Sequence, residues 1–173
     1  MSGFVIHAVP VLRGILAIAP LPGAGGDYDA DLEHLRDWRP AMVLSMTEAH
    51  EMTAVGAADL NHAIVAMGAR WVHVPVPDFG VPDAAGTAIW RKRAPLAISA
   101  LRGGGRVLIH CRGGCGRSGM AALRLMVEAG EPAEAALARL RAVRACAVET
   151  SAQRRWALQG TAPGDVGPAG RDG

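Results

Sequence analysis

Lysine and aromatic residues are scarce in this chain of 173 residues. Lys92 is the only lysine, Tyr28 is the only tyrosine, and the formal net charge is +2. So small a charge excludes a strongly basic nucleic-acid-binding protein, and the lack of an aromatic stripe speaks against base stacking. Arginine carries nearly all of the positive charge, and we interpret this as a compositional bias that abundant alanine and glycine accompany.

Cysteine is also scarce, and no hydrophobic run is long enough to cross a membrane. Cys111, Cys115 and Cys146 form an odd set whose spacing is not typical of a disulfide framework, which predicts reduced thiols. The apolar N-terminus has no basic start and is interrupted by Arg13, so a secretory signal is not expected. These absences predict a cytoplasmic protein that makes no contact with membranes.

The sequence does contain enough apolar surface for one packed domain, because 50% of its residues are hydrophobic and 20% are charged. Segments typical of strands alternate with segments typical of helices, which predicts an α/β domain with a central, mainly parallel sheet flanked by helices. We expect this domain over residues 1–159 and a disordered, glycine- and proline-rich tail over residues 160–173. The expected strands are 4–9, 12–19, 42–46, 71–76 and 106–109, and the expected helices are 27–38, 54–67, 85–101, 118–129, 131–145 and 150–158.

The most informative stretch is His110-Cys111-Arg112-Gly113-Gly114-Cys115-Gly116-Arg117-Ser118. An apolar run, residues 107–109, precedes it, and a helical pattern follows it. A strand that turns through a glycine-rich loop into a helix directs backbone N–H groups and the positive end of the helix dipole into the turn. The sequence therefore predicts an anion-binding loop between a strand and a helix.

Cys111 and Arg117 lie six positions apart in this loop. The positive field of the loop favours the thiolate form of Cys111, which is the nucleophilic form. The planar guanidinium of Arg117 suits two phosphate oxygens at once. A thiolate below a bound phosphoryl group is the arrangement that cysteine-based phosphatase chemistry requires.

This stretch resembles the His-Cys-x5-Arg-Ser signature of the protein tyrosine and dual-specificity phosphatases, and its glycines are most similar to those of the small kinase-associated type. The resemblance implies that Cys111 attacks phosphorus and that Arg117 holds the phosphate. It further implies that Ser118 helps the thiolate to leave and that His110 braces the loop. The residues that would bind the substrate phosphate are Arg112, Gly113, Gly114, Cys115, Gly116 and Arg117.

A general acid that protonates the departing oxygen is expected on a second loop. In the family this acid is an aspartate some thirty residues before the cysteine, and Asp78 lies 33 residues before Cys111. Asp78 also follows a proline, as the family's acid commonly does, so the resemblance assigns the role to it. Asp83 is the competitor, and its alternative role is the N-cap of the following helix. A further alternative is that both are plain turn residues.

Residues 147–153 resemble a late segment of the family whose glutamines position the hydrolytic water. Gln153 matches one of these positions and is assigned a supporting role. The alternative is that Gln153 only helps to cap a helix that starts near Thr150. Glu149 stands where tyrosine-specific members carry glutamine, which departs from the family pattern.

Residues 47–51 resemble a loop that borders the pocket in small dual-specificity members, and we interpret His50 in this loop as a solvent-exposed histidine. The histidines have no metal-ligand spacing, and Cys111 and Cys115 lack a second pair of cysteine or histidine ligands. We therefore expect neither a metal nor a cofactor.

Two roles remain open for Cys115. In the first, it packs against the sheet as a small apolar residue. In the second, it resolves an oxidised Cys111 as a disulfide, which requires the loop to open so that the two sulfurs can meet.

The expected function is a phosphoprotein phosphatase that hydrolyses phosphotyrosine, with phosphoserine and phosphothreonine as further substrates, through a phosphocysteine intermediate. Its partner is a phosphorylated protein, and the chain is expected to be a monomer. One alternative is a phosphoinositide or inositol phosphate phosphatase of the same fold, for which Arg112 is the one further basic residue in the loop. The other alternative is a phosphate-binding module without turnover.

Overall fold

Five strands form one sheet in the order β1-β2-β5-β3-β4. The computed structural model describes residues 3–160. The strands are β1 (His7–Val11), β2 (Gly14–Ala19), β3 (Met42–Ser45), β4 (Arg70–His73) and β5 (Arg106–His110). The helices found in the described residues are α1 (Tyr28–Trp38), α2 (Ala49–Ala54), α3 (Leu60–Ala66), α4 (Ala84–Arg102), α5 (Gly116–Glu128), α6 (Ala133–Val143) and α7 (Ser151–Leu158).

The sheet is mainly parallel, as predicted. Strands β2, β5, β3 and β4 run in the same direction, and β1 pairs with β2 in the antiparallel direction. Strand β5 lies at the centre, where Ile109 pairs with Ile18 of β2 on one side and with Leu44 of β3 on the other. Because parallel strands end at the same edge of a sheet, the carboxyl ends of these four strands surround one region.

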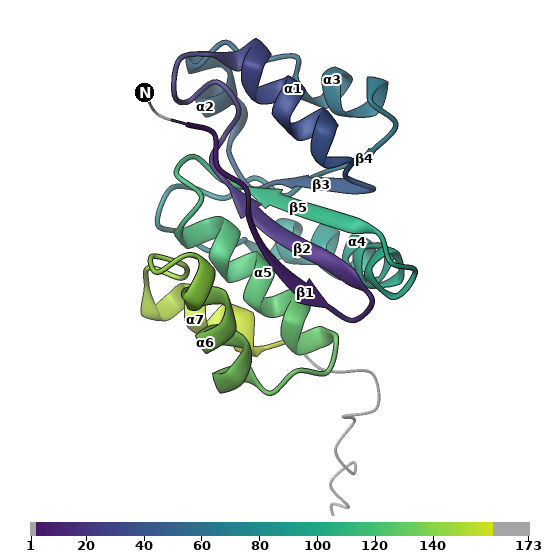
Figure 1. Cartoon of the computed structure of the whole chain (residues 1–173). Helices are drawn as coiled ribbons and strands as arrows, with labels where there is room; N and C mark the ends of the chain where they lie inside the picture. The colour runs from purple at the N-terminus through teal and green to yellow at the C-terminus, as the bar shows by residue number, and fades with distance from the viewer. Residues whose placement is uncertain (1–2, 161–173) are drawn as a thin grey trace, which may run out of the picture.

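Helices cover both faces of the sheet (Figure 1). Helices α1, α2 and α3 pack on one face, and α4, α5, α6 and α7 pack on the other. Strand β5 is apolar on both faces for this reason: Leu108 packs into the first layer, and Val107 and Ile109 pack into the second. The predicted α/β architecture is therefore confirmed.

Several predicted boundaries are wrong. The first strand is His7–Val11 and includes Pro10, which β1 accommodates because it is an edge strand. The helix expected over residues 54–67 is helical only in its second half, as α3, because α2 precedes it and ends at Ala54. The chain turns between them at Gly56, whose φ of +78° favours glycine. Helix α2 therefore occupies part of the segment 47–51 that was expected to be a loop.

The expected tail, residues 160–173, lies outside the described residues except for Gly160. Over residues 3–160, no helix combines the length and the apolar character that crossing a bilayer requires.

Candidate active site

The glycine-rich loop lies where β5 ends and α5 begins. Strand β5 ends at His110, and Gly116 is the first residue of α5. Cys111 follows the strand directly, at the carboxyl edge of the sheet where ligands bind in open α/β folds. The predicted strand, loop and helix are thus present around the nucleophile.

The loop carbonyls accept hydrogen bonds from groups that lie outside the loop. In a trans peptide the N–H points opposite to the preceding carbonyl, so the N–H groups of residues 113–116 point to the inside. A concave set of N–H groups in front of a helix N-terminus binds anions. The carbonyl of Arg112 accepts from the N–H of Leu21 at 3.1 Å. Those of Gly113 and Gly114 accept from the guanidinium of Arg144 at 3.0 and 3.2 Å. That of Cys115 accepts from the N–H groups of Gly119 at 2.9 Å and Val148 at 3.3 Å.

Gly114 is required at its position for two reasons. Its φ is +72°, in the left-handed region that side chains disfavour. A Cβ there would also lie 2.7 Å from the carbonyl carbon of Ala19 at the end of β2. At Gly113, in contrast, a Cβ would meet nothing within 4 Å. Of these two glycines, therefore, only Gly114 packs tightly against the end of β2.

Cys111 is buried, with 3% of its surface exposed, and it is a free thiol. Its Sγ lies 3.2 Å from the Oγ of Ser118, the third residue of α5, which is fully buried. A hydroxyl at this distance can donate a hydrogen bond to a thiolate. The structure thus brings Cys111 and Ser118 together.

His110 supports the loop from the sheet side. Its Nδ1 lies 3.3 Å from the carbonyl oxygen of Cys111, and its Nε2 lies 2.5 Å from the Oγ of Ser45. Ser45 in turn accepts a hydrogen bond from the indole N–H of Trp71 at 2.8 Å. Burial lowers the pKa of His110 to about 4, so the ring is neutral, with Nδ1–H donating to the carbonyl and Nε2 accepting from Ser45.

Arg117 is anchored by Glu51, a residue to which the sequence assigned no role. The two Nη atoms of Arg117 donate to the two carboxylate oxygens at 2.7 and 2.8 Å, and both side chains are buried. Burial by itself would raise the pKa of Glu51, but hydrogen bonds from Arg117 and from the backbone of Glu48 hold it below its usual range. Glu51 is therefore a charged, buried partner of the arginine.

One edge of the guanidinium, called the free edge below, makes no hydrogen bond with the described residues. Nη1 of Arg117 also donates to the carbonyl of Val76 at 2.8 Å, so hydrogen bonds among the described residues use three of the five N–H groups of Arg117. The two that remain are on Nε and Nη2, along one edge of the planar group. Two N–H groups on one edge can bind two phosphate oxygens at once.

Asp78 lies beside the same edge. Its Oδ1 is 3.4 Å from Nη2 of Arg117, and 56% of its side chain is exposed. Asp83 lies elsewhere and caps α4, where its Oδ1 accepts a hydrogen bond from the N–H of Gly86 at 2.7 Å. The capping alternative for Asp83 is therefore confirmed, and Asp78 is the aspartate that reaches the arginine.

Gln153 forms a capping box with Thr150 at the start of α7, as the alternative for it predicted. Its side-chain oxygen accepts from the N–H groups of Glu149 and Thr150. Its Nε2 donates to the carbonyl of Gly80 at 3.2 Å, which links α7 to the loop that carries Asp78. The role of Gln153 in positioning water stays a prediction.

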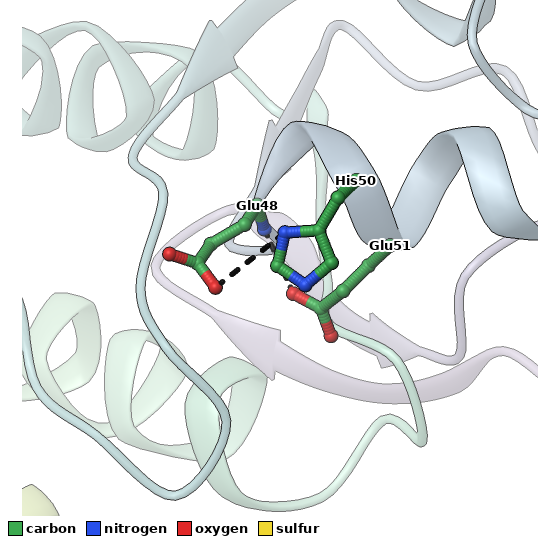
Figure 2. Close-up of side chains that lie close together, drawn as sticks. All are labelled: Glu48, His50 and Glu51. Atoms are coloured by element: carbon green, nitrogen blue, oxygen red, sulfur yellow. Dashed lines mark hydrogen bonds and ion pairs between the residues drawn. The ribbon is translucent and has the colours of Figure 1, made fainter.

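Glu48, His50 and Glu51 lie close together at the start of α2 (Figure 2). His50 is exposed, and its Nδ1 lies 3.8 Å from a carboxylate oxygen of Glu48. Both oxygens of Glu51, however, already bind Arg117, and one also accepts from the N–H of Glu48 at 2.8 Å. A carboxylate that a buried guanidinium occupies is not available as a metal ligand, so we assign this group to capping α2 and anchoring Arg117.

Cys115 and Cys146 are joined by a disulfide, which contradicts the prediction of three reduced thiols. Their Cα atoms lie 5.1 Å apart, although the residues are separated by 31 positions. Neither role expected for Cys115 is observed, because its sulfur is bonded to Cys146 in the connection between α6 and α7. The pairing depends on how α5 and α6 pack, which the spacing of the cysteines does not reveal.

A free thiol, a buried arginine and an anion-binding loop at the end of a central parallel strand define the fold of the cysteine-based phosphatases. Residues 27–135 match the family of cyclin-dependent kinase inhibitor 3 (CDKN3). The chain belongs to this family. No curated protein sequence matches the chain.

Solved structures share the fold. Kinase-associated phosphatase with a serine in place of its catalytic cysteine has a TM-score of 0.79 and 22% identity, covering 92% of this chain and 94% of that one. The active form of Tk-PTP has a TM-score of 0.67 and 24% identity, with coverages of 88% and 95%. PTPMT1 in complex with PI(5)P has a TM-score of 0.71 and 17% identity, with coverages of 88% and 93%.

Proposed function

We propose that this protein is a cysteine-dependent phosphatase that hydrolyses phosphotyrosine, with phosphoserine and phosphothreonine as further substrates, through a phosphocysteine intermediate. The observation that carries the proposal is the free edge of Arg117, whose Nη2 lies 3.4 Å from Asp78 and which belongs to the helix that follows the Cys111 loop. A phosphate on this edge also meets the inward N–H groups of residues 113–116. It then lies over the sulfur, as in-line attack requires.

In the first step, the Cys111 thiolate attacks phosphorus while Asp78 protonates the departing oxygen. The negative charge that builds up on the phosphoryl oxygens is stabilised by the N–H groups of the loop and by Arg117. In the second step, a water attacks the phosphocysteine, and the sulfur leaves as a thiolate that the hydroxyl of Ser118 stabilises at 3.2 Å. Asp78 accepts the proton of that water, and we assign to Gln153 the role of orienting it.

The exposure of the residues around the acid supports the wider choice of phosphorylated residues. Asp78 is 56% exposed, and Phe79, the next residue, is 60% exposed. A site whose acid lies so near the surface is accessible to the short side chains of phosphoserine and phosphothreonine. We propose a phosphorylated protein as the partner of a monomer that acts in the cytoplasm without metal or cofactor.

A phosphoinositide phosphatase is the second candidate. Arg112 is exposed at the rim of the loop and has no part in the anchoring of Arg117, so it is available for a second phosphate group. PTPMT1, which has the same fold, binds PI(5)P. Hydrolysis of phosphoinositides in preference to phosphopeptides would select this candidate.

Hydrolysis of a generic aryl phosphate in the presence of excess chelator tests the main proposal. We expect wild-type protein to turn over and Cys111→Ser to lose turnover yet still bind inorganic phosphate, because the loop and Arg117 are intact. Equal rates for the two proteins would overturn the proposal. Binding of phosphate by wild-type protein without turnover would instead identify a phosphate-binding module.

A further inference from the structure

The disulfide between Cys115 and Cys146 joins the anion-binding loop to the segment that supports it. Cys115 directly precedes α5 and supplies the last loop carbonyl. Cys146 lies between α6 and α7 and is exposed to solvent. The sulfur of Cys115 lies 3.9 Å from the carbonyl oxygen of Gly113 in the loop, whereas Cys111 is buried and unpaired.

The supporting segment, residues 144–148, holds three of the loop carbonyls. Arg144 donates to those of Gly113 and Gly114, and the N–H of Val148 donates to that of Cys115. The N–H groups that would bind phosphate face inward only while these carbonyls stay in place. The position of the segment therefore decides the shape of the anion site.

The segment is held in an unfavourable conformation at Val148. Its φ is +66°, a value that β-branched residues rarely adopt. Arg141 fixes this conformation by donating to the carbonyls of Ala147 and Val148, both at 2.9 Å. Strained backbone persists where its surroundings restrain it, and the bridge at Cys146 is one such restraint two residues away.

We propose that Cys115 and Cys146 form a reversible redox site that controls the rigidity of the loop, and through it the affinity for phosphate, while Cys111 stays a free thiol. Closing the bridge fixes the support and keeps the N–H groups aligned. Opening it removes one of the two restraints on Val148 and leaves Arg141 as the other. The hydrogen bond from Val148 to the carbonyl of Cys115 is then less firmly held, while the bond from Gly119 of α5 to the same carbonyl stays in place. Only the link to phosphate affinity rests on the proposed function.

The reactant is a small-molecule disulfide such as oxidised glutathione. The exposed Cys146 thiolate attacks one of its sulfurs, and one glutathione thiolate leaves. The Cys115 thiolate then attacks the sulfur of Cys146 in this mixed disulfide, and the second glutathione thiolate leaves. Two electrons pass from the protein dithiol to glutathione disulfide, and the two departing thiolates take up the two protons. Excess reduced glutathione reverses both steps.

Cys111→Ser protein equilibrated in oxidising and reducing glutathione buffers tests the proposal without interference from the nucleophile. Mass spectrometry should find the Cys115–Cys146 crosslink in the oxidised sample. Amide hydrogen exchange at residues 112–116 should be slower in that sample. Calorimetry with inorganic phosphate should give a dissociation constant about three- to tenfold lower when the bridge is closed, because the site is then preorganised.

The matched control is Cys146→Ser in the same background, which leaves the loop sequence unchanged. It should behave like the reduced protein and should not respond to the buffer. Equal exchange and equal affinity in both buffers, or no crosslink in the oxidised sample, would overturn the redox site. If the bridge alters exchange while wild-type protein hydrolyses no aryl phosphate, the redox site stands and the proposed function fails. If wild-type protein turns over and neither exchange nor affinity responds to the buffer, the proposed function stands and the redox site fails.

Discussion

At the scale of one residue, Glu51 holds the guanidinium of Arg117 in a fixed position before any phosphate binds. Its carboxylate meets Arg117 in a pair in which 7% and 2% of the two side chains are exposed. The guanidinium is therefore already held in place before a phosphate binds, so no further side-chain ordering of Arg117 is needed on binding. A lysine at position 117 could not hold Glu51 and two phosphate oxygens together.

Glu51→Gln should therefore destabilise the protein. The variant keeps the size of the side chain but leaves the buried arginine without its counter-charge, a change that typically costs about 3 kcal/mol or more. Denaturant unfolding should show this loss. Saturating inorganic phosphate should raise the Tm of the variant more than that of wild type, since the bound anion replaces the missing charge. An unchanged free energy of unfolding would contradict this account.

Asp78→Ala should lower kcat by roughly a hundredfold or more, as the loss of a general acid does. Steady-state kinetics of the variant and of wild type measures this effect. Asp83→Ala is the control, with a loss of about 1 kcal/mol of stability through the α4 cap and little change in kcat. A larger rate loss at Asp83 would reverse the assignment.

His110 makes stability depend on pH in a defined direction. Its pKa is lowered from 6.5 in an unfolded chain to about 4 in the fold, so the unfolded state takes up the proton first. The free energy of unfolding should therefore be unaffected by His110 above pH 6.5 and should fall between about 6.5 and 4, by up to about 3 kcal/mol. Urea unfolding across this range, compared with His110→Gln, isolates the contribution. Equal slopes in the two proteins would rule it out.

At the scale of elements, the close packing of α5 against the segment before α7 depends on a glycine in α5. At Gly119 in α5, a Cβ would lie 2.6 Å from the nitrogen of Val148 and 2.9 Å from the Cα of Ala147. These are backbone atoms that cannot turn aside as the end of a side chain can. The helix therefore approaches the supporting segment as closely as it does only because glycine stands there.

Gly119→Ala should cost about 1–3 kcal/mol, the range for overpacking, although alanine is the better helix former by about 1 kcal/mol. Gly113→Ala is the matched control, since nothing lies within 4 Å of a Cβ at that glycine. Its free energy of unfolding should stay within about 0.5 kcal/mol of wild type. Thermal and urea unfolding of both variants test this difference in stability. Equal stability of the two would show that residues 144–148 move away from α5 without cost.

Sequence reasoning succeeded for the local structure that consecutive residues form. Cys111 follows a strand, and Arg117 and Ser118 lie in the first turn of the next helix, so their arrangement follows from local geometry. It missed Glu51 because the partner of this residue lies 66 positions away, and a buried acid in a short helix has no pattern of its own. The pairing of Cys115 with Cys146 was missed for the same reason. Both depend on tertiary packing.

At the scale of the whole molecule, α7, the last described helix, packs into the core. Trp156 of α7 contacts the edge of Trp90 of α4 with ring centroids 5.2 Å apart. The guanidinium carbon of Arg124 of α5 lies over the ring of Trp156 at 4.2 Å from its centroid. Three helices thus meet near the end of the described chain, and the domain boundary after residue 159 stays a prediction.

A chain that ends after Gly160 should fold and work like the full-length protein. Its Tm should stay within about 2 °C and its kcat should be unchanged, because the contacts of α7 are retained. Removing α7 as well should abolish cooperative unfolding, since it uncovers Trp90 and Arg124. Calorimetric scans of the two shortened chains test the boundary. A large loss of stability on removal of residues 161–173 alone would extend the domain beyond it.

The pairing of Arg117 with Glu51 has a consequence for how ionic strength acts on the protein. An arriving phosphate meets the buried Arg117–Glu51 pair, whose net charge is zero, and the N–H groups of the loop, instead of a cluster of exposed cations. Dissolved ions screen exposed charges beyond about 8–10 Å but hardly reach buried groups. The affinity for phosphate should thus depend little on salt. Sensitivity to salt would arise instead from exposed charges such as Arg112, and it would appear in how fast a large phosphorylated partner arrives.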